Sequence, residues 1–290
     1  MRARRAPSPG LAPWLFFFAV LGIFPLLYAL ALSFLSYNPL RPDLVRWVGF
    51  DNYARALENP SFWRALRTTV IFVVGTLPVT LTLAYLVAAL LASARRAQGF
   101  FRAAIFFPAT LSMVVISLVF KSLYAEEGLL NGWLASAGLP RVHWLQDPSL
   151  ALPSIMLMDV WASVGYYAIL ILAARKTLPD EQLEAARLEG ISRLRVERKI
   201  VLPHVRPVLL FVVLLNTIRS FQIFIEPFVL TRGGPLESTL TLVYYLYERA
   251  FYHFQMGYAS ALAFLLLVLV GLILLVQRRL LGRGSAEAAA

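Results

Sequence analysis

The stretch LEAARLEGISRLRVERKIVLP, residues 183–203, is a charged island between two apolar runs. Pro179 stands shortly before it and suits the first turn of a helix, where acidic residues are also favoured. Gly190 can adopt the positive φ that ends a helix, and Ser192 suits the cap of a second one. Pro203 then closes the unit. The stretch predicts two short helices around a turn, ahead of the next apolar run.

The composition around this island is that of an integral membrane protein. The chain of 290 residues is 59% hydrophobic and only 15% charged, against about 25% charged in soluble domains. The net charge of +11 is not gathered in a solvated basic domain, which argues against nucleic-acid binding. The chain has no Cys, so thiol chemistry and Cys-ligated metals are excluded, and it has no phosphate-binding G-x-x-x-x-G-K-[ST] loop.

Six segments are long and apolar enough to cross a bilayer, which takes about 20 residues. The first follows basic RARR, as a signal peptide would, but its apolar run is too long, so we expect an uncleaved helix. The sequence predicts an all-α polytopic membrane protein with one transmembrane domain over residues 1–290. The predicted spans are 14–36, 69–92, 103–123, 151–173, 206–226 and 258–277.

The distribution of Lys and Arg predicts the orientation. With the N-terminus in the cytoplasm, seventeen of these residues fall on the cytoplasmic side and eight on the outside. Cytoplasmic loops of membrane proteins carry the excess of Lys and Arg. We therefore expect both termini, and the charged island, to face the cytoplasm.

Four polar residues interrupt the predicted fifth span: Asn216, Arg219, Gln222 and Glu226. On one continuous helix they fall within about 120° of one face. Asp159, in the predicted fourth span, and Arg219 lie at the same depth, on the order of 12 Å from the outer end at 1.5 Å per residue. We expect the two to be neighbours. They either order the bundle or line a pathway, with Asn216 and Gln222 bonding substrate hydroxyls.

The island resembles the conserved cytoplasmic loop of permease subunits of bacterial binding-protein-dependent ABC importers. Glu184-Ala185-Ala186, Gly190, Ile200 and Leu202-Pro203 carry this resemblance. Further segments resemble the maltose and glycerol 3-phosphate branch of that family. They include PWLFFFAVLGIFPLLYALALSF, VGFDNYARAL, FRAAIFFPATLS, GLLN, TRGGP and GYASA, in this order along the chain.

The resemblance implies a type I ABC importer permease fold of six helices, with a coupling helix-turn-helix at residues 177–203. In that family this loop docks on a separate ATPase. The residues implied in the contact are Glu184, Ala185, Ala186, Gly190, Leu202 and Pro203. The chain departs from the family at Glu189 and Ile191, and at Leu194, Glu197 and Arg198, where aromatic residues are frequent. The sequence offers no role for Glu197 and Arg198.

The resemblance also implies what the chain works with. It would form half of the translocation pathway for a sugar or sugar-like solute in the bacterial cytoplasmic membrane. Three partners would complete the importer: a second permease chain that is related to this one but different from it, an ATPase dimer holding Mg-ATP, and an extracytoplasmic solute-binding protein. We expect no catalytic residue, cofactor or metal on this chain. The alternative is an ion-coupled secondary transporter, which often shows repeated halves, and the sequence shows no such repeat.

Overall fold

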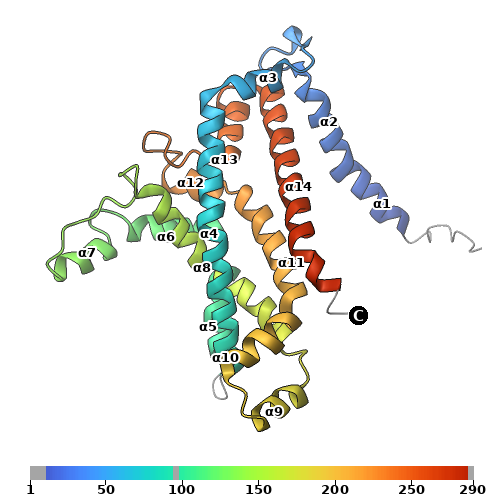
Figure 1. The fold of residues 1–290 in the computed structure, drawn as a ribbon. Coiled ribbons are helices and arrows are strands. Elements are labelled where there is room, and N and C mark those ends of the chain that lie inside the picture. The colour runs from blue at the N-terminus through green and yellow to red at the C-terminus, as the bar shows by residue number, and fades with distance from the viewer. Residues whose placement is uncertain (1–10, 94–97, 287–290) are drawn as a thin grey trace, which may run out of the picture. The chain divides into compact units, whose positions relative to one another are not determined.

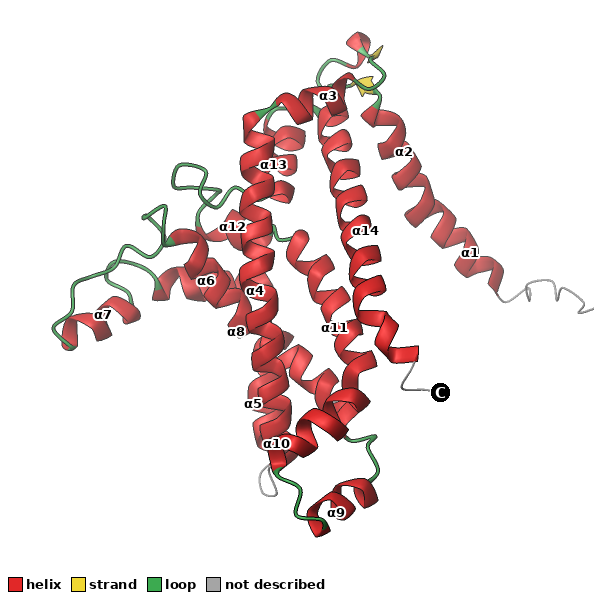
Figure 2. Cartoon of the chain, viewed as in Figure 1, coloured by secondary structure: helices red, strands yellow, loops and turns green. Residues whose placement is uncertain are grey.

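The computed structural model describes residues 11–93 and 98–286, so the basic clusters at 2–5 and 95–96 lie outside it. Helices make up most of the described chain, as Figures 1 and 2 show. The long helices are α4 (Pro60–Ser93), α5 (Gln98–Thr110), α6 (Met113–Leu123), α8 (Ala151–Arg175), α11 (Leu202–Phe221) and α14 (Met256–Ala286). Among the described residues the only paired strands are β1 (Leu35–Ser36) and β2 (Arg46–Trp47), which are antiparallel. The all-α fold class is confirmed.

The shorter elements join these long helices. A first apolar rod is built from α1 (Ala12–Phe18), the π-helical turn η2 (Ala19–Ile23) and α2 (Phe24–Ser33). The connections hold the 3₁₀ turn η3 (Pro42–Leu44), α3 (Asp51–Glu58), α7 (Leu129–Ser136), α13 (Leu242–Tyr247) and the π-helical turn η5 (Glu248–Tyr252).

The chain forms two compact units. One contains the described residues up to Trp63 together with Tyr245–Val268. The other contains Arg64–Tyr244 and the described residues from Leu269 onward. The charged island and the predicted polar residues all belong to the second unit.

In the first unit, Asn52 connects α3 to the C-terminal end of α2 and the residues that follow it. Its buried amide donates hydrogen bonds to the carbonyl oxygens of Ser33, at 2.9 Å, and Leu35, at 3.0 Å. Gly257 of α14 lies against the Leu35 carbonyl, where a Cβ would collide. Small residues allow this close approach of helix and chain, so Gly257 packs within its own chain.

In the second unit, α8 is the most enclosed helix. It packs against α5, α6 and α11, and its side chains join two apolar clusters to which α4 also contributes. Gly165 permits the contact with α5, because a Cβ there would collide with the Ile105 carbonyl. The core therefore surrounds the helix that carries Asp159.

The structure divides the predicted third span into two helices. Among the described residues, five helices are long and apolar enough to cross a membrane, and α5 and α6 counted together make a sixth. These two helices meet at an angle of 94°. Pro108 lies near the end of α5, and Ser112 adopts extended backbone before α6, with φ −63° and ψ 136°. Pro108 is a sequence signal for a kink at this place, but apolar composition on both sides gave no indication of the size of the bend.

The second helix of the charged island is also longer than predicted. α10 (Arg193–Val196) continues through the π-helical turn η4 (Glu197–Val201) directly into α11. Pro203 therefore does not separate the island from the fifth span. A proline inside a regular helix clashes with the preceding turn, and the wider turn η4 lies at that place.

Candidate functional site

The charged segment, residues 177–203, projects from the second unit between α8 and α11 (Figure 1). Its first helix, α9 (Asp180–Leu188), begins directly after Pro179. Gly190 has φ +68°. The Gly190 amide donates to the Arg187 carbonyl at 3.1 Å, and the Ile191 amide to the Ala186 carbonyl at 3.0 Å. This bond pattern ends a helix at a residue with positive φ, so the predicted role of Gly190 in the turn is confirmed.

Ser192 occupies the predicted cap position before α10, but its side chain makes no capping hydrogen bond. The turn is therefore fixed by the backbone bonds around Gly190 rather than by this hydroxyl.

The segment presents much of its surface to solvent. Of the residues predicted to contact an ATPase, Ala186 is buried, and the rest are exposed: Glu184, Ala185, Gly190, Leu202 and Pro203. Leu188 is 90% exposed and Leu194 is 61% exposed. Neither leucine was among the predicted contact residues, although exposed apolar residues in a charged loop are a signal for a contact with a partner.

A buried polar cluster, defined by Asp159, Asn216, Arg219 and Glu226, lies where α8 and α11 meet. Arg219 Nη2 is 2.6 Å from Asp159 Oδ1 and 3.6 Å from Glu226 Oε1. The side chain of Asp159 is 2% exposed and that of Arg219 is 36% exposed. The predicted neighbourhood of Asp159 and Arg219 is confirmed, and they form a direct ion pair.

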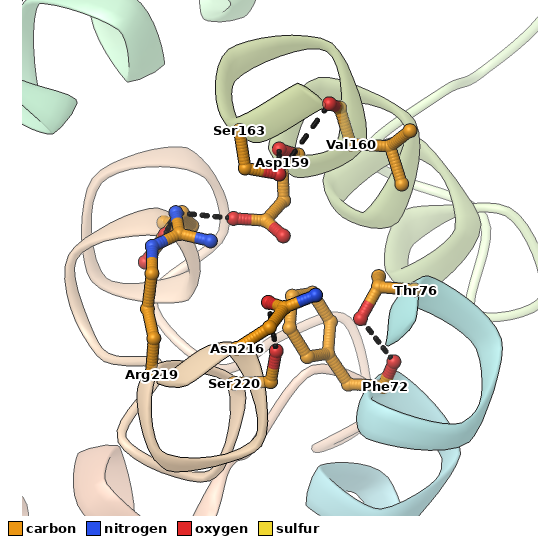
Figure 3. Close-up of polar contacts among 9 residues, drawn as sticks. Phe72, Thr76, Asp159, Val160, Ser163, Asn216, Arg219 and Ser220 are labelled. Carbon is orange, nitrogen blue, oxygen red and sulfur yellow. Dashed lines mark hydrogen bonds and ion pairs between the residues drawn. The ribbon is translucent and has the colours of Figure 1, made fainter. Parts of the chain in front are cut away.

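Asn216 completes the cluster on the side of α4. Ser220 Oγ donates to its amide oxygen at 3.2 Å. In Figure 3 the amide of Asn216 lies between the carboxylate of Asp159 on α8 and Thr76 on α4. Within the described part of the chain, Asp159 Oδ2 and Asn216 Nδ2 are buried and have no hydrogen-bond partner. Buried polar atoms are nearly always hydrogen-bonded. The cluster is therefore unusual, because it contains one buried acceptor and one buried donor that have no partner.

The prediction that Asn216, Arg219, Gln222 and Glu226 share one face of a single helix is wrong. α11 ends at Phe221, so Gln222 follows the helix and is exposed, outside the cluster. Glu226 is buried and reaches Arg219 from the next helix, α12 (Ile225–Leu230). Pro227 explains the break, because a continuous helix would place its ring against the carbonyl of Ile223.

The cluster brings together carboxylate, amide and guanidinium groups. Such groups bond hydroxyls and order helices.

Comparison with known proteins gives a consistent picture. The family model described as "binding-protein-dependent transport system inner membrane component" matches residues 56–284. The lactose transport system permease protein LacF of Rhizobium radiobacter is 32% identical over 272 residues, covering 92% of this chain and 90% of the relative. The probable ABC transporter permease protein YesP of Bacillus subtilis is 32% identical over 271 residues, covering 92% and 87%.

Solved structures share the fold. A chain of a bacterial ABC transporter that imports the acidic polysaccharide alginate superposes with a TM-score of 0.84 at 20% identity. The superposition covers 94% of each chain.

Proposed function

We propose, since the chain belongs to the family of binding-protein-dependent transport system inner membrane components, that it forms half of the pathway of an ATP-driven sugar importer. The chain is a permease subunit of the ABC transporter family, and relatives that cover most of it are named as permeases for lactose and diacetylchitobiose. The observation that carries the proposal is the charged segment, which ends α9 at Gly190 and leaves Leu188 and Leu194 exposed.

The charged segment would dock on a separate ATPase at the cytoplasmic face. Glu184, Ala185 and Gly190 are exposed there, and Leu202 and Pro203 are exposed at the start of α11. ATP with Mg²⁺ would bind on that partner, and this chain would hold no cofactor or metal. Both termini would lie in the cytoplasm, by the excess of Lys and Arg on that side.

The buried polar cluster would contact the solute. Asp159 Oδ2 and Asn216 Nδ2 supply an acceptor and a donor of the kind that sugar hydroxyls satisfy. Two carboxyl groups face one guanidinium group, so the cluster carries no surplus positive charge. We therefore expect a neutral sugar rather than an acidic one. A second permease chain would supply the other half of the pathway, and an extracytoplasmic binding protein would deliver the solute.

The test is purification of the tagged chain from its own membranes, with identification of what accompanies it. We expect an ATPase, a second permease chain and, after reconstitution in liposomes, ATP hydrolysis stimulated by one solute-loaded binding protein from a panel. Glu184→Lys should abolish uptake while membrane insertion persists. Uptake that follows an ion gradient with no ATPase present would overturn the proposal in favour of a secondary transporter.

A further inference from the structure

Glu197, for which the sequence offered no role, forms the centre of a three-residue contact at the C-terminal end of α8. Arg175 Nη1 donates to Glu197 Oε2 at 2.7 Å, and Arg175 Nη2 donates to Glu197 Oε1 at 2.6 Å. The Tyr85 hydroxyl of α4 donates to Glu197 Oε2 at 2.7 Å. A two-pronged guanidinium–carboxylate pair fixes direction as well as distance. We call these three residues the base lock.

The base lock is partly shielded from water. The side chain of Arg175 is 9% exposed and that of Glu197 is 31% exposed. Beside it lies an apolar cluster of Leu178, Val201 and Val205, against which the ring of Tyr85 packs. Removing one member of such a pair leaves a poorly solvated charge on the other, so the pair resists separation.

The base lock and the Asp159–Arg219 pair connect the same two helical segments, α8 and the continuous helix α10–η4–α11. α8 carries Asp159 and Arg175, about 24 Å apart at 1.5 Å per residue. The continuous helix α10–η4–α11 carries Glu197 and Arg219, roughly 33 Å apart by the same rise. One ion pair connects the C-terminal end of α8 with η4, and the other connects α8 with the C-terminal part of α11. Two ion pairs at separated points oppose sliding and separation of α8 and the helix α10–η4–α11.

We propose that the base lock makes the charged segment, α8 and α11 one rigid body, so that displacement of the segment by an ATPase moves the buried polar cluster with it. Tyr85, Arg175 and Glu197 are positioning residues for coupling. The proposal rests on the proposed function for the identity of the driving partner. Tyr85 contributes one hydroxyl bond from α4, whereas Arg175 contributes two, so Arg175 carries most of the effect.

The first experiment measures rigidity in the purified chain and needs no partner. The chain has no Cys, so Leu188→Cys on α9 and Leu157→Cys on α8 allow site-specific spin labelling, and both positions are exposed. We expect one narrow distance distribution by pulsed electron paramagnetic resonance, and a broad one after Arg175→Leu. Lys176→Leu, which removes a charge from the neighbouring exposed residue, is the matched control. An unchanged distribution in Arg175→Leu overturns the proposal.

The second experiment measures coupling in the reconstituted importer. In Arg175→Leu we expect ATPase to co-purify and ATP to be hydrolysed, while solute imported per ATP falls about fivefold or more. Exchanging the charges with Arg175→Glu and Glu197→Arg should restore most of that ratio, and Lys176→Leu should not alter it. A normal ratio in the Arg175→Leu and Arg175→Glu single variants overturns the lock. Loss of ATPase from the wild-type chain overturns the proposed function instead, and the distance measurement still decides the lock.

Discussion

Arg219 and Asp159 form an ion pair of 2.6 Å between α11 and α8, with the carboxylate almost wholly buried. Glu226 lies 3.6 Å from the same guanidinium nitrogen and comes from the short helix α12. Two carboxylates thus converge on one cation, and one buried carboxylate oxygen retains an unused acceptor position. This arrangement joins three helices at one point of the second unit.

A double-mutant cycle with Asp159→Asn and Arg219→Gln measures the strength of the Asp159–Arg219 pair. Each single change leaves its partner poorly compensated, so we expect a coupling of about 1–3 kcal/mol in thermal or denaturant unfolding. The Arg64–Glu237 pair, with both side chains exposed, is the control, and its cycle should give less than about 1 kcal/mol. Additive effects at Asp159 and Arg219 would contradict the assigned pair.

Asn216 separates a pathway role from a structural one. Its amide nitrogen is unpartnered among the described residues, whereas its amide oxygen accepts the Ser220 hydroxyl, so Asn216→Leu should cost about 1–3 kcal/mol of stability without abolishing folding. If the amide bonds the solute, the same change should lower uptake by roughly tenfold, which corresponds to about one lost hydrogen bond. Gln222→Leu, at an exposed position beyond the helix, should leave uptake unchanged. Full uptake in Asn216→Leu would remove this residue from the pathway.

Gly165 tests the contact of α8 with α5. Gly165→Leu places a side chain where the Ile105 carbonyl already lies, and we expect a loss of about 1–3 kcal/mol of stability or failure to accumulate. Gly271 also lies inside a long helix but has open space around its Cβ position. Gly271→Ala should therefore be neutral or stabilising by up to about 1 kcal/mol. Equal melting temperatures for Gly165→Leu and the wild type would disprove the close contact.

Gly190 tests the turn of the charged segment. Gly190→Val forces a β-branched residue to positive φ, which costs at least about 1–2 kcal/mol locally, and should reduce co-purification of the ATPase. Gly138 ends α7 with φ +74° and equally open surroundings, so Gly138→Val applies similar strain elsewhere. Gly190→Asn should keep most activity, because Asn tolerates this conformation. The hypothesis fails if both valine variants retain the ATPase equally well.

Leu188 tests the docking surface itself. Because it is 90% exposed, Leu188→Glu should leave the melting temperature unchanged. Burying a leucine against a partner contributes about 1.5–3 kcal/mol, so loss of this contact should weaken ATPase binding by roughly tenfold to a hundredfold. Leu236, 88% exposed in the loop after α12, is the matched control, and Leu236→Glu should bind ATPase normally. Undiminished binding in Leu188→Glu would place the docking surface elsewhere.

The sequence by itself determined the membrane helices, the turn at Gly190 and the neighbourhood of Asp159 and Arg219. Long apolar runs identified the membrane helices, because a bilayer-spanning helix must satisfy its backbone internally and cover itself with apolar side chains. Gly190 was identifiable as the turn because few residues adopt positive φ. The neighbourhood of Asp159 and Arg219 followed from equal depth in adjacent spans, because charges inside a bilayer face the bundle interior.

Other features were decided only by the tertiary structure. Pro108 and Pro227 mark the neighbourhoods of the bend between α5 and α6 and of the end of α11 at Phe221, but a proline in the sequence does not give the angle or the exact residue of a break. Glu226 therefore reached Arg219 from a separate helix, and Gln222 moved out of the cluster. The contact of Arg175 with Glu197 joins residues on different helices. Hydropathy and helical period report what one segment buries, whereas the partner of a buried charge depends on how segments pack against each other.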